Sequence, residues 1–174
     1  MPNVQPIETK NIDQYGNDAL PWSRAIGALE GISHENITWF LSTVDPGGAP
    51  HTAGVGAVWC DGGLYFVSGP GTRKSRNLEA RPAASIGVAL EALDLVFEGT
   101  ARRITGKPTL EKLAKHYREE GGWPAEVEGE GFTAPFTAPS GGPPPWNVYE
   151  FDFRAVYGIA KVEPYGATRW RFSG

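Results

Sequence analysis

Short strand-like runs separated by glycine and proline turns restrict this sequence to a small set of folds. Residues with β-branched or aromatic side chains gather in these runs, which is typical of β-strands. The predicted strands cover residues 38–44, 51–59, 64–68, 84–90, 93–104, 147–153, 155–162 and 167–172. Turn sequences such as Asp45-Pro46-Gly47-Gly48 and Asp61-Gly62-Gly63 separate consecutive runs, so neighbouring strands are expected to pair as antiparallel hairpins.

Helical patterns are fewer. Residues 21–31 place Trp22, Ala25, Ile26 and Leu29 on one face, and residues 109–120 form the clearest amphipathic helix. A third, short helix is expected after the turn at Gly69, because Arg81-Pro82 stops it. Eight or so strands with two or three helices indicate a mainly β protein, an antiparallel barrel with helices at its sides.

The length of 174 residues fits one domain with a sizeable core. Residues 1–35 are interpreted as a polar, irregular arm followed by the short helix, and residues 36–174 as the barrel. The barrel is interrupted at 121–146, where six glycines and six prolines fall within twenty-six residues. Irregular stretches of this length are usually functional or disordered. Trp123, Phe132, Phe136 and Trp146 suggest that this one packs against something, such as the edge of a pocket.

Composition excludes several classes of protein. The net charge of −4 argues against a nucleic-acid-binding surface. Cys60 is the only cysteine, so an intrachain disulfide and cysteine-rich metal motifs are excluded. The histidines lack metal-ligand spacing, and no metal site is predicted. No signal-peptide pattern or membrane-length apolar run is found, so a cytoplasmic protein without a membrane partner is expected.

The candidate site begins with Gly69-Pro70-Gly71-Thr72-Arg73-Lys74-Ser75-Arg76-Asn77-Leu78, a glycine-rich turn that opens a helix. A helix N-terminus carries partial positive charge, which disfavours the cations Arg73, Lys74 and Arg76 there. Their placement makes sense if an anion such as phosphate binds, because cations and free N–H groups would both contact it. From these residues alone, a solvated basic turn remains the alternative.

The strand at 51–59 is the second unusual feature. Thr52, Ala53, Gly54, Gly56 and Ala57 are all small, and glycine inside a strand costs stability. Such glycines often mark the close approach of a ligand or of another backbone. Small residues beside a cationic turn would suit a flat ligand that carries a phosphate.

The order of these elements resembles the split β-barrel family of pyridoxamine-phosphate-oxidase-like flavoproteins, and in particular the flavin and deazaflavin oxidoreductases of actinobacteria. Three places carry the resemblance, over roughly residues 35–172. They are His51-Thr52-Ala53-Gly54-Val55, then Val67-Ser68-Gly69 leading into Thr72–Leu78, and the terminal Ala167-Thr168-Arg169-Trp170-Arg171-Phe172. The resemblance implies a split antiparallel β-barrel like that of FMN-binding proteins, and it favours the anion-site interpretation of the turn.

The resemblance also implies where a cofactor would bind. The strand from His51 to Val55 would lie along the tricyclic ring, and the turn from Ser68 to Lys74 would hold the phosphate. The family's cofactor sits at a homodimer interface, so a second chain would complete the site. The implied cofactor-binding residues are His51, Thr52, Ala53, Gly54, Val55, Val67, Ser68, Thr72, Arg73, Lys74, Arg76, Asn77, Trp170 and Arg171. Of these, Arg76 and Asn77 would reach phosphate or a cofactor tail, and Trp170 or Arg171 would contact the ring across the dimer.

The function implied is hydride transfer between coenzyme F420, or FMN, and a small organic substrate. F420 is preferred because Thr-Arg-Lys-x-Arg-Asn-Leu resembles the deazaflavin branch and the extra arginine suits a longer anionic tail. The alternative is a non-catalytic carrier of flavin, haem or tetrapyrrole on the same barrel. His51 stands where true pyridoxamine-phosphate oxidases have arginine, which argues against vitamin metabolism. No acid–base pair or catalytic triad stands out, so no catalytic residue is assigned.

Overall fold

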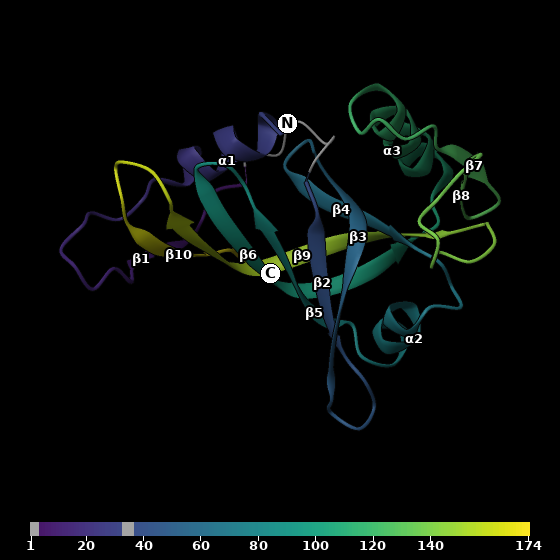
Figure 1. The fold of residues 1–174 in the computed structure, drawn as a ribbon, viewed down its shortest axis with the longest axis horizontal. Coiled ribbons are helices and arrows are strands. Elements are labelled where there is room, and N and C mark those ends of the chain that lie inside the picture. The colour runs from purple at the N-terminus through teal and green to yellow at the C-terminus, as the bar shows by residue number, and fades with distance from the viewer. Residues whose placement is uncertain (1–3, 33–36) are drawn as a thin grey trace.

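The computed structural model describes residues 4–32 and 37–174, which contain ten strands and three helices (Figure 1). In chain order these are β1 (Glu8–Asn11), α1 (Trp22–Glu30), β2 (Trp39–Val44), β3 (Pro50–Cys60), β4 (Gly63–Ser68), α2 (Arg73–Ala80), β5 (Ala83–Ala89), β6 (Leu93–Ile104), α3 (Lys107–Glu119), β7 (Glu126–Glu128), β8 (Gly131–Thr133), β9 (Asn147–Ala160) and β10 (Ala167–Arg171).

The strands close into a barrel. The main sheet has eight strands in the order β1-β10-β9-β4-β3-β2-β5-β6, and an additional pairing of β9 with β6 joins its two sides. Six strands therefore form the closed barrel, and β10 and β1 extend the sheet beyond β9. All these pairings are antiparallel. The expected fold class, mainly β with flanking helices in a split antiparallel barrel, is confirmed.

The long strand β9 corrects one expectation. The prediction of two strands, at 147–153 and 155–162, is wrong, because residues 147–160 form one strand. Glu98 pairs with Ala155 and Gly99 with Phe153, which leaves Arg154 as the extra residue of a β-bulge. A bulge changes which residues face the interior, so the break in alternation that resembles a turn is a bulge. A Cβ on Gly99 would lie 2.1 Å from the Asp152 carbonyl oxygen, which explains glycine opposite the bulge.

The interior is divided into two apolar clusters. The larger fills the barrel with side chains such as Trp39, Phe66 and Phe97 and includes one face of α1. Trp22 of α1 packs edge-on against Trp170, with ring centroids 5.2 Å apart, so α1 shares the barrel core. The smaller cluster lies between α3, the β7–β8 hairpin and the ends of β3 and β9.

Two segments expected to be irregular contain strands. Residues 8–11, within the predicted arm, form β1 and pair with β10. All four β1 residues are exposed, so the strand has no alternating apolar pattern in the sequence. Within 121–146, β7 and β8 form a hairpin, and the buried Phe132 is bridged to Trp146. The predicted division at residues 35 and 36 lies outside the described residues.

Candidate functional site

A cluster of hydroxyl groups builds the turn between β4 and α2. Thr72 is the N-cap of α2 and accepts a hydrogen bond from the Ser75 backbone N–H at 3.3 Å. The Ser68 Oγ lies 3.0 Å from the Thr72 hydroxyl and 2.8 Å from the Ser75 hydroxyl. Ser75 was not predicted as part of the site, because a serine at this helix position gives no signal of its contact with Ser68.

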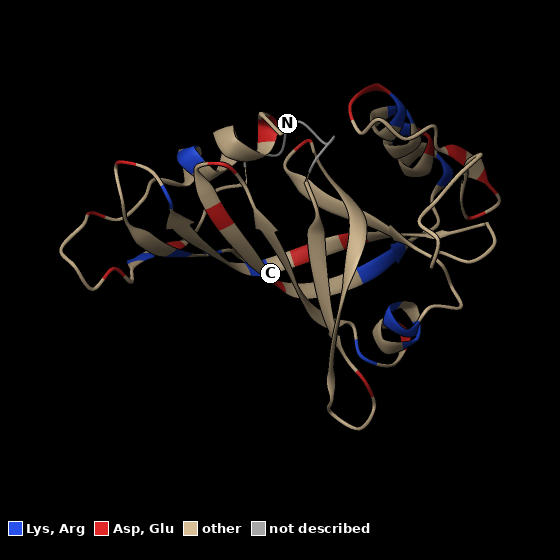
Figure 2. Cartoon of the chain, in the orientation of Figure 1, with Lys and Arg blue, Asp and Glu red and all other residues tan. Residues whose placement is uncertain are grey.

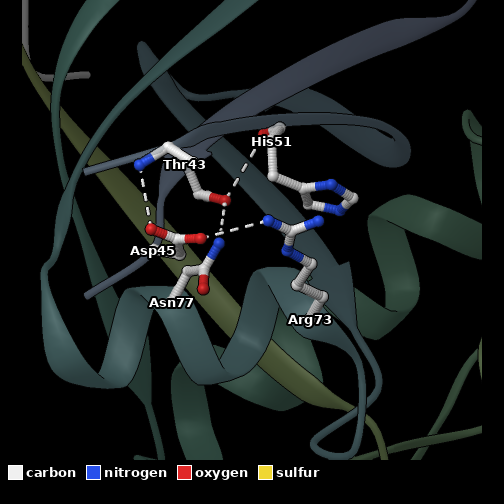
Figure 3. Close-up of polar contacts among 6 residues, drawn as sticks. Thr43, Asp45, His51, Arg73 and Asn77 are labelled. Atoms are coloured by element: carbon white, nitrogen blue, oxygen red, sulfur yellow. Dashed lines mark hydrogen bonds and ion pairs between the residues drawn. The ribbon is translucent and has the colours of Figure 1, made fainter. Parts of the chain in front are cut away.

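The cations of the turn differ in how they are satisfied. Arg73 forms an ion pair with Asp45 at 3.2 Å (Figure 3), and Arg76 donates a hydrogen bond to the Gly71 carbonyl. Lys74 makes no hydrogen bond or ion pair with any described residue, although it is only partly exposed. Burial lowers the pKa of Lys74 below its ordinary value. A partly desolvated ammonium without a counterion favours the binding of an anion. Figure 2 shows the positive charge gathered on α2.

Asn77 has a structural partner inside the protein. Its Nδ2 donates to the Thr43 Oγ1 at 3.0 Å, and that hydroxyl donates to the His51 carbonyl at 3.4 Å (Figure 3). Asn77 is buried, and these bonds tie α2 to β2 and β3. Asn77 therefore fixes the position of the basic helix in this chain and lies outside the cavities described next.

Two adjacent cavities lie between this turn, β3 and the 121–146 segment. The larger, of about 560 Å³, is lined by His51, Ala53, Thr72, Arg73 and Lys74, together with Pro70, Gly71 and residues 140–143. The smaller, of about 230 Å³, has an apolar and aromatic lining. Its wall consists of Gly54, Val55, Gly56, Val67, Ser68, Gly69, Lys74, Trp123, Phe136, Thr137, Ala138, Ser140, Gly141 and Trp146. Lys74, Ser140 and Gly141 line both cavities.

The first half of β3 is accessible along its length. None of residues 50–56 is buried, whereas residues 57–60 all are. His51 and Ala53 face the larger cavity. Thr52 points to the opposite side of the sheet, because strand residues alternate, and its hydroxyl lies 2.8 Å from that of Ser42. By the same alternation Thr52 shares its face of β3 with Gly54 and Gly56, but Thr52 itself lines neither cavity.

Two tryptophans fix the segment that walls the cavities. The Trp123 indole N–H donates to the Phe136 carbonyl at 2.8 Å, and the Trp146 indole N–H donates to the Gly142 carbonyl at 3.0 Å. Both rings also line the smaller cavity. Phe132 is instead fully buried behind them. The wall residues 140–143 were not predicted, because a small, proline-rich run gives no signal of what it covers.

The remaining predicted residues lie elsewhere in the chain. Trp170 is 0% exposed and enclosed in the barrel core beside Trp22. The Arg171 guanidinium lies 3.9 Å from the Glu8 carboxylate. Neither Trp170 nor Arg171 lines either cavity. A contact of Arg171 with a cofactor in a second chain stays a prediction, while Trp170 would first have to leave the core. Arg76 is exposed beside the turn and does not line either cavity.

Two further findings concern the described part of the chain. Among residues 4–32 and 37–174, no group of three or more His, Cys, Asp or Glu side chains is arranged to hold a metal ion. Within the same residues, no helix combines the length and the apolar character needed to cross a bilayer.

The closed six-stranded barrel with a cationic turn at its side defines a split-barrel protein, and comparison identifies its family. The Pyridoxamine 5'-phosphate oxidase family model matches residues 27–159. The chain therefore belongs to this family, which confirms the resemblance found in the sequence. No protein with a curated description matches the chain.

Solved structures share the fold at low sequence identity. A pyridoxamine 5'-phosphate oxidase-related, FMN binding protein from Nostoc punctiforme has a TM-score of 0.57 and 18% identity, over 86% of this chain and 88% of that one. An F420 reductase has a TM-score of 0.50 and 20% identity, over 73% and 94%. A NimC/NimA family protein from Clostridium acetobutylicum has a TM-score of 0.55 and 13% identity, over 85% and 90%.

Proposed function

We propose that this protein is an oxidoreductase that binds a phosphorylated flavin or deazaflavin in the larger cavity. The observation that carries the proposal is Lys74, a half-buried ammonium without a partner among the described residues. It lines a cavity of about 560 Å³, which is within the usual range for ligand sites, roughly 300–1,000 Å³. Family membership and the names of the FMN-binding and F420 reductase structures support the proposal.

The residues fit such a ligand. Lys74 and Arg73 would contact the phosphate, and the first N–H groups of α2 are oriented by the Thr72 cap. His51 and Ala53 would lie against the flat ring, where the small side chain of Ala53 lets the ring approach the backbone. When bound, the cofactor would supply the hydride chemistry, while the chain would supply position and charge.

Coenzyme F420 is our preferred ligand, with FMN as the second. Both carry a phosphate, and the preference rests on Arg76. Its side chain is exposed beside the turn, where it would meet an anionic tail that extends beyond the phosphate. The substrate proposed is a small organic molecule, and the protein is proposed to act in the cytoplasm.

A second copy of the chain is proposed to complete the site. On the outer face of β2, Phe40 is 52% exposed and pairs with Gly54 on one side and Gly87 on the other. Val96, which pairs with Gly87 from β6, is 41% exposed, so the apolar surface continues across neighbouring strands, as is typical of an interface. Because Gly54 also lines the smaller cavity, a chain packed on this face would lie against that cavity, which shares Lys74, Ser140 and Gly141 with the proposed cofactor site.

Titration of the purified protein with F420 and with FMN, followed by absorbance and fluorescence, tests the function. We expect micromolar or tighter binding of one of them and a loss of about tenfold or more in Lys74→Met. Lys115→Met, on the exposed side of α3, is the matched control because it removes a lysine outside both cavities.

Equal affinity in the wild type and Lys74→Met would contradict the assigned anion site. Tight binding of FMN but not F420 would reverse the cofactor preference. A tight complex that turns over with no reductant or acceptor would support the alternative, a carrier of flavin, haem or tetrapyrrole.

A further inference from the structure

We propose that the smaller cavity binds the second reactant, and that this reactant is a small, uncharged aromatic compound held between Trp123 and Phe136. This inference rests on the proposed function, because it assigns the larger cavity to the cofactor. It names the class of substrate, which the proposed function leaves as a small organic molecule.

Size separates the two cavities. The larger, about 560 Å³, has room for a phosphorylated cofactor, whereas the smaller, about 230 Å³, lies below the usual range for such ligands. Its floor is formed by Gly54 and Gly56, which have no side chains to fill it. A Cβ on Gly56 would meet no atom within 4 Å. The space therefore suits a compound of one or two fused rings.

The residues that line the smaller cavity disfavour a charged second reactant. Among the described residues that line the smaller cavity, Lys74 alone is charged, and it is the residue assigned to the cofactor phosphate. Both tryptophan N–H donors are already used, by the carbonyls of Phe136 and Gly142. The aromatic side chains thus offer ring faces and edges, and apart from Lys74 the described wall offers a second charged ligand no opposite charge.

The two cavities are also placed for transfer between their ligands. Lys74, Ser140 and Gly141 line both, so a ring on β3 and a compound between the aromatic side chains would be neighbours. Hydride transfer requires such contact between the two reactants. Phe136 completes the outer wall and is 60% exposed, so it can be changed without opening the core.

The test is a calorimetric titration of protein saturated with FMN or F420, whichever binds. The probe is 4-nitroanisole, an uncharged planar compound. 4-Nitrobenzoate tests the effect of charge, and nitrocyclohexane tests planarity. We expect 4-nitroanisole to bind at least tenfold more tightly than either comparison compound.

Phe136→Ala is expected to weaken 4-nitroanisole binding about fivefold to tenfold and to leave cofactor affinity unchanged. The variant keeps the backbone carbonyl that accepts the Trp123 hydrogen bond. Tyr165→Ala is the matched control, because Tyr165 is 51% exposed and lines neither cavity.

The outcomes separate this inference from the proposed function. Cofactor binding without 4-nitroanisole binding overturns the inference alone, as does equal affinity in Phe136→Ala or equal affinity for 4-nitrobenzoate. Displacement of 4-nitroanisole by the cofactor also overturns it, because the two would then share one cavity. If neither cofactor binds, the proposed function fails, and the inference fails with it.

Discussion

Lys74 is the side chain on which the proposed anion site depends most. Its neighbours Arg73 and Arg76 are held by Asp45 and by the Gly71 carbonyl. Lys74 is the cation of the turn that remains without a partner among the described residues, and it lines both cavities. The same half-buried position that makes it available to an anion also makes its charge depend on pH.

Cofactor affinity is therefore expected to fall in the alkaline range. Burial lowers the pKa of Lys74 below its ordinary value of 10.5, so the free protein loses this charge at a lower pH than an exposed lysine would. Affinity is full below that lowered pKa and falls as the pH rises through it. Titrations between about pH 7 and pH 10.5 measure the effect, since an unperturbed lysine titrates near 10.4.

Lys74→Arg provides the control, because a guanidinium does not titrate in this range. Its affinity is expected to stay nearly constant over the pH values at which the wild type weakens. The same decline in both proteins would assign the pH dependence to another group.

At this scale, sequence reasoning could select candidate residues where residue type and position agreed. Cations at a helix N-terminus are unfavourable without an anion, so Arg73 and Lys74 could be singled out, and the structure places both on the larger cavity. The hydrogen bond that occupies Asn77 depends on Thr43, a residue thirty-four positions away. No local pattern contains that information.

At the scale of elements, the close contact between the basic turn and the 121–146 segment sets the shape of the site. A Cβ on Gly69 would lie 1.9 Å from the Gly141 carbonyl oxygen. Gly69→Ala is therefore expected to displace residues 136–143 while the barrel stays folded. Limited proteolysis should cleave this segment at least several times faster, with a decrease of about 1–3 kcal/mol in the free energy of unfolding.

Gly71→Ala is the matched control, because a Cβ there would meet no atom within 4 Å. We expect its proteolysis rate to match the wild type. Unchanged cleavage in Gly69→Ala would mean that the segment is not held against the turn.

Most barrel strands and all three helices could be predicted, since alternation, turns and caps are encoded locally. The single strand β9 could not, because a bulge and a turn both interrupt alternation and only the pairing with β6 separates them. Strand β1 also escaped prediction, since its pairing with β10 relies on the backbone and its side chains are exposed.

For the whole molecule, the exposed face around Phe40 predicts a twofold dimer. Phe40→Glu places a charge on this face and is expected to shift the protein toward monomer, measured by light scattering at micromolar concentration. Cofactor affinity should weaken with it if the second chain completes the site. Tyr165→Glu is the control, since Tyr165 is similarly exposed, at 51%, in the turn between β9 and β10. A wild type that is monomeric at this concentration would contradict the predicted dimer.

The indole hydrogen bonds of Trp123 and Trp146 depend on backbone carbonyls of the wall segment and not on its side chains. Both rings lie beside the barrel, and their N–H groups donate hydrogen bonds to the backbone carbonyls of residues 136 and 142. Any amino acid supplies such a carbonyl at position 136, whereas position 142, with φ +72°, favours glycine. Selection could therefore replace the side chains between residues 136 and 142 while both hydrogen bonds to the segment are kept. The barrel and its basic turn would then serve as a constant frame, and new substrate preferences could arise by exchange of about half a dozen wall residues.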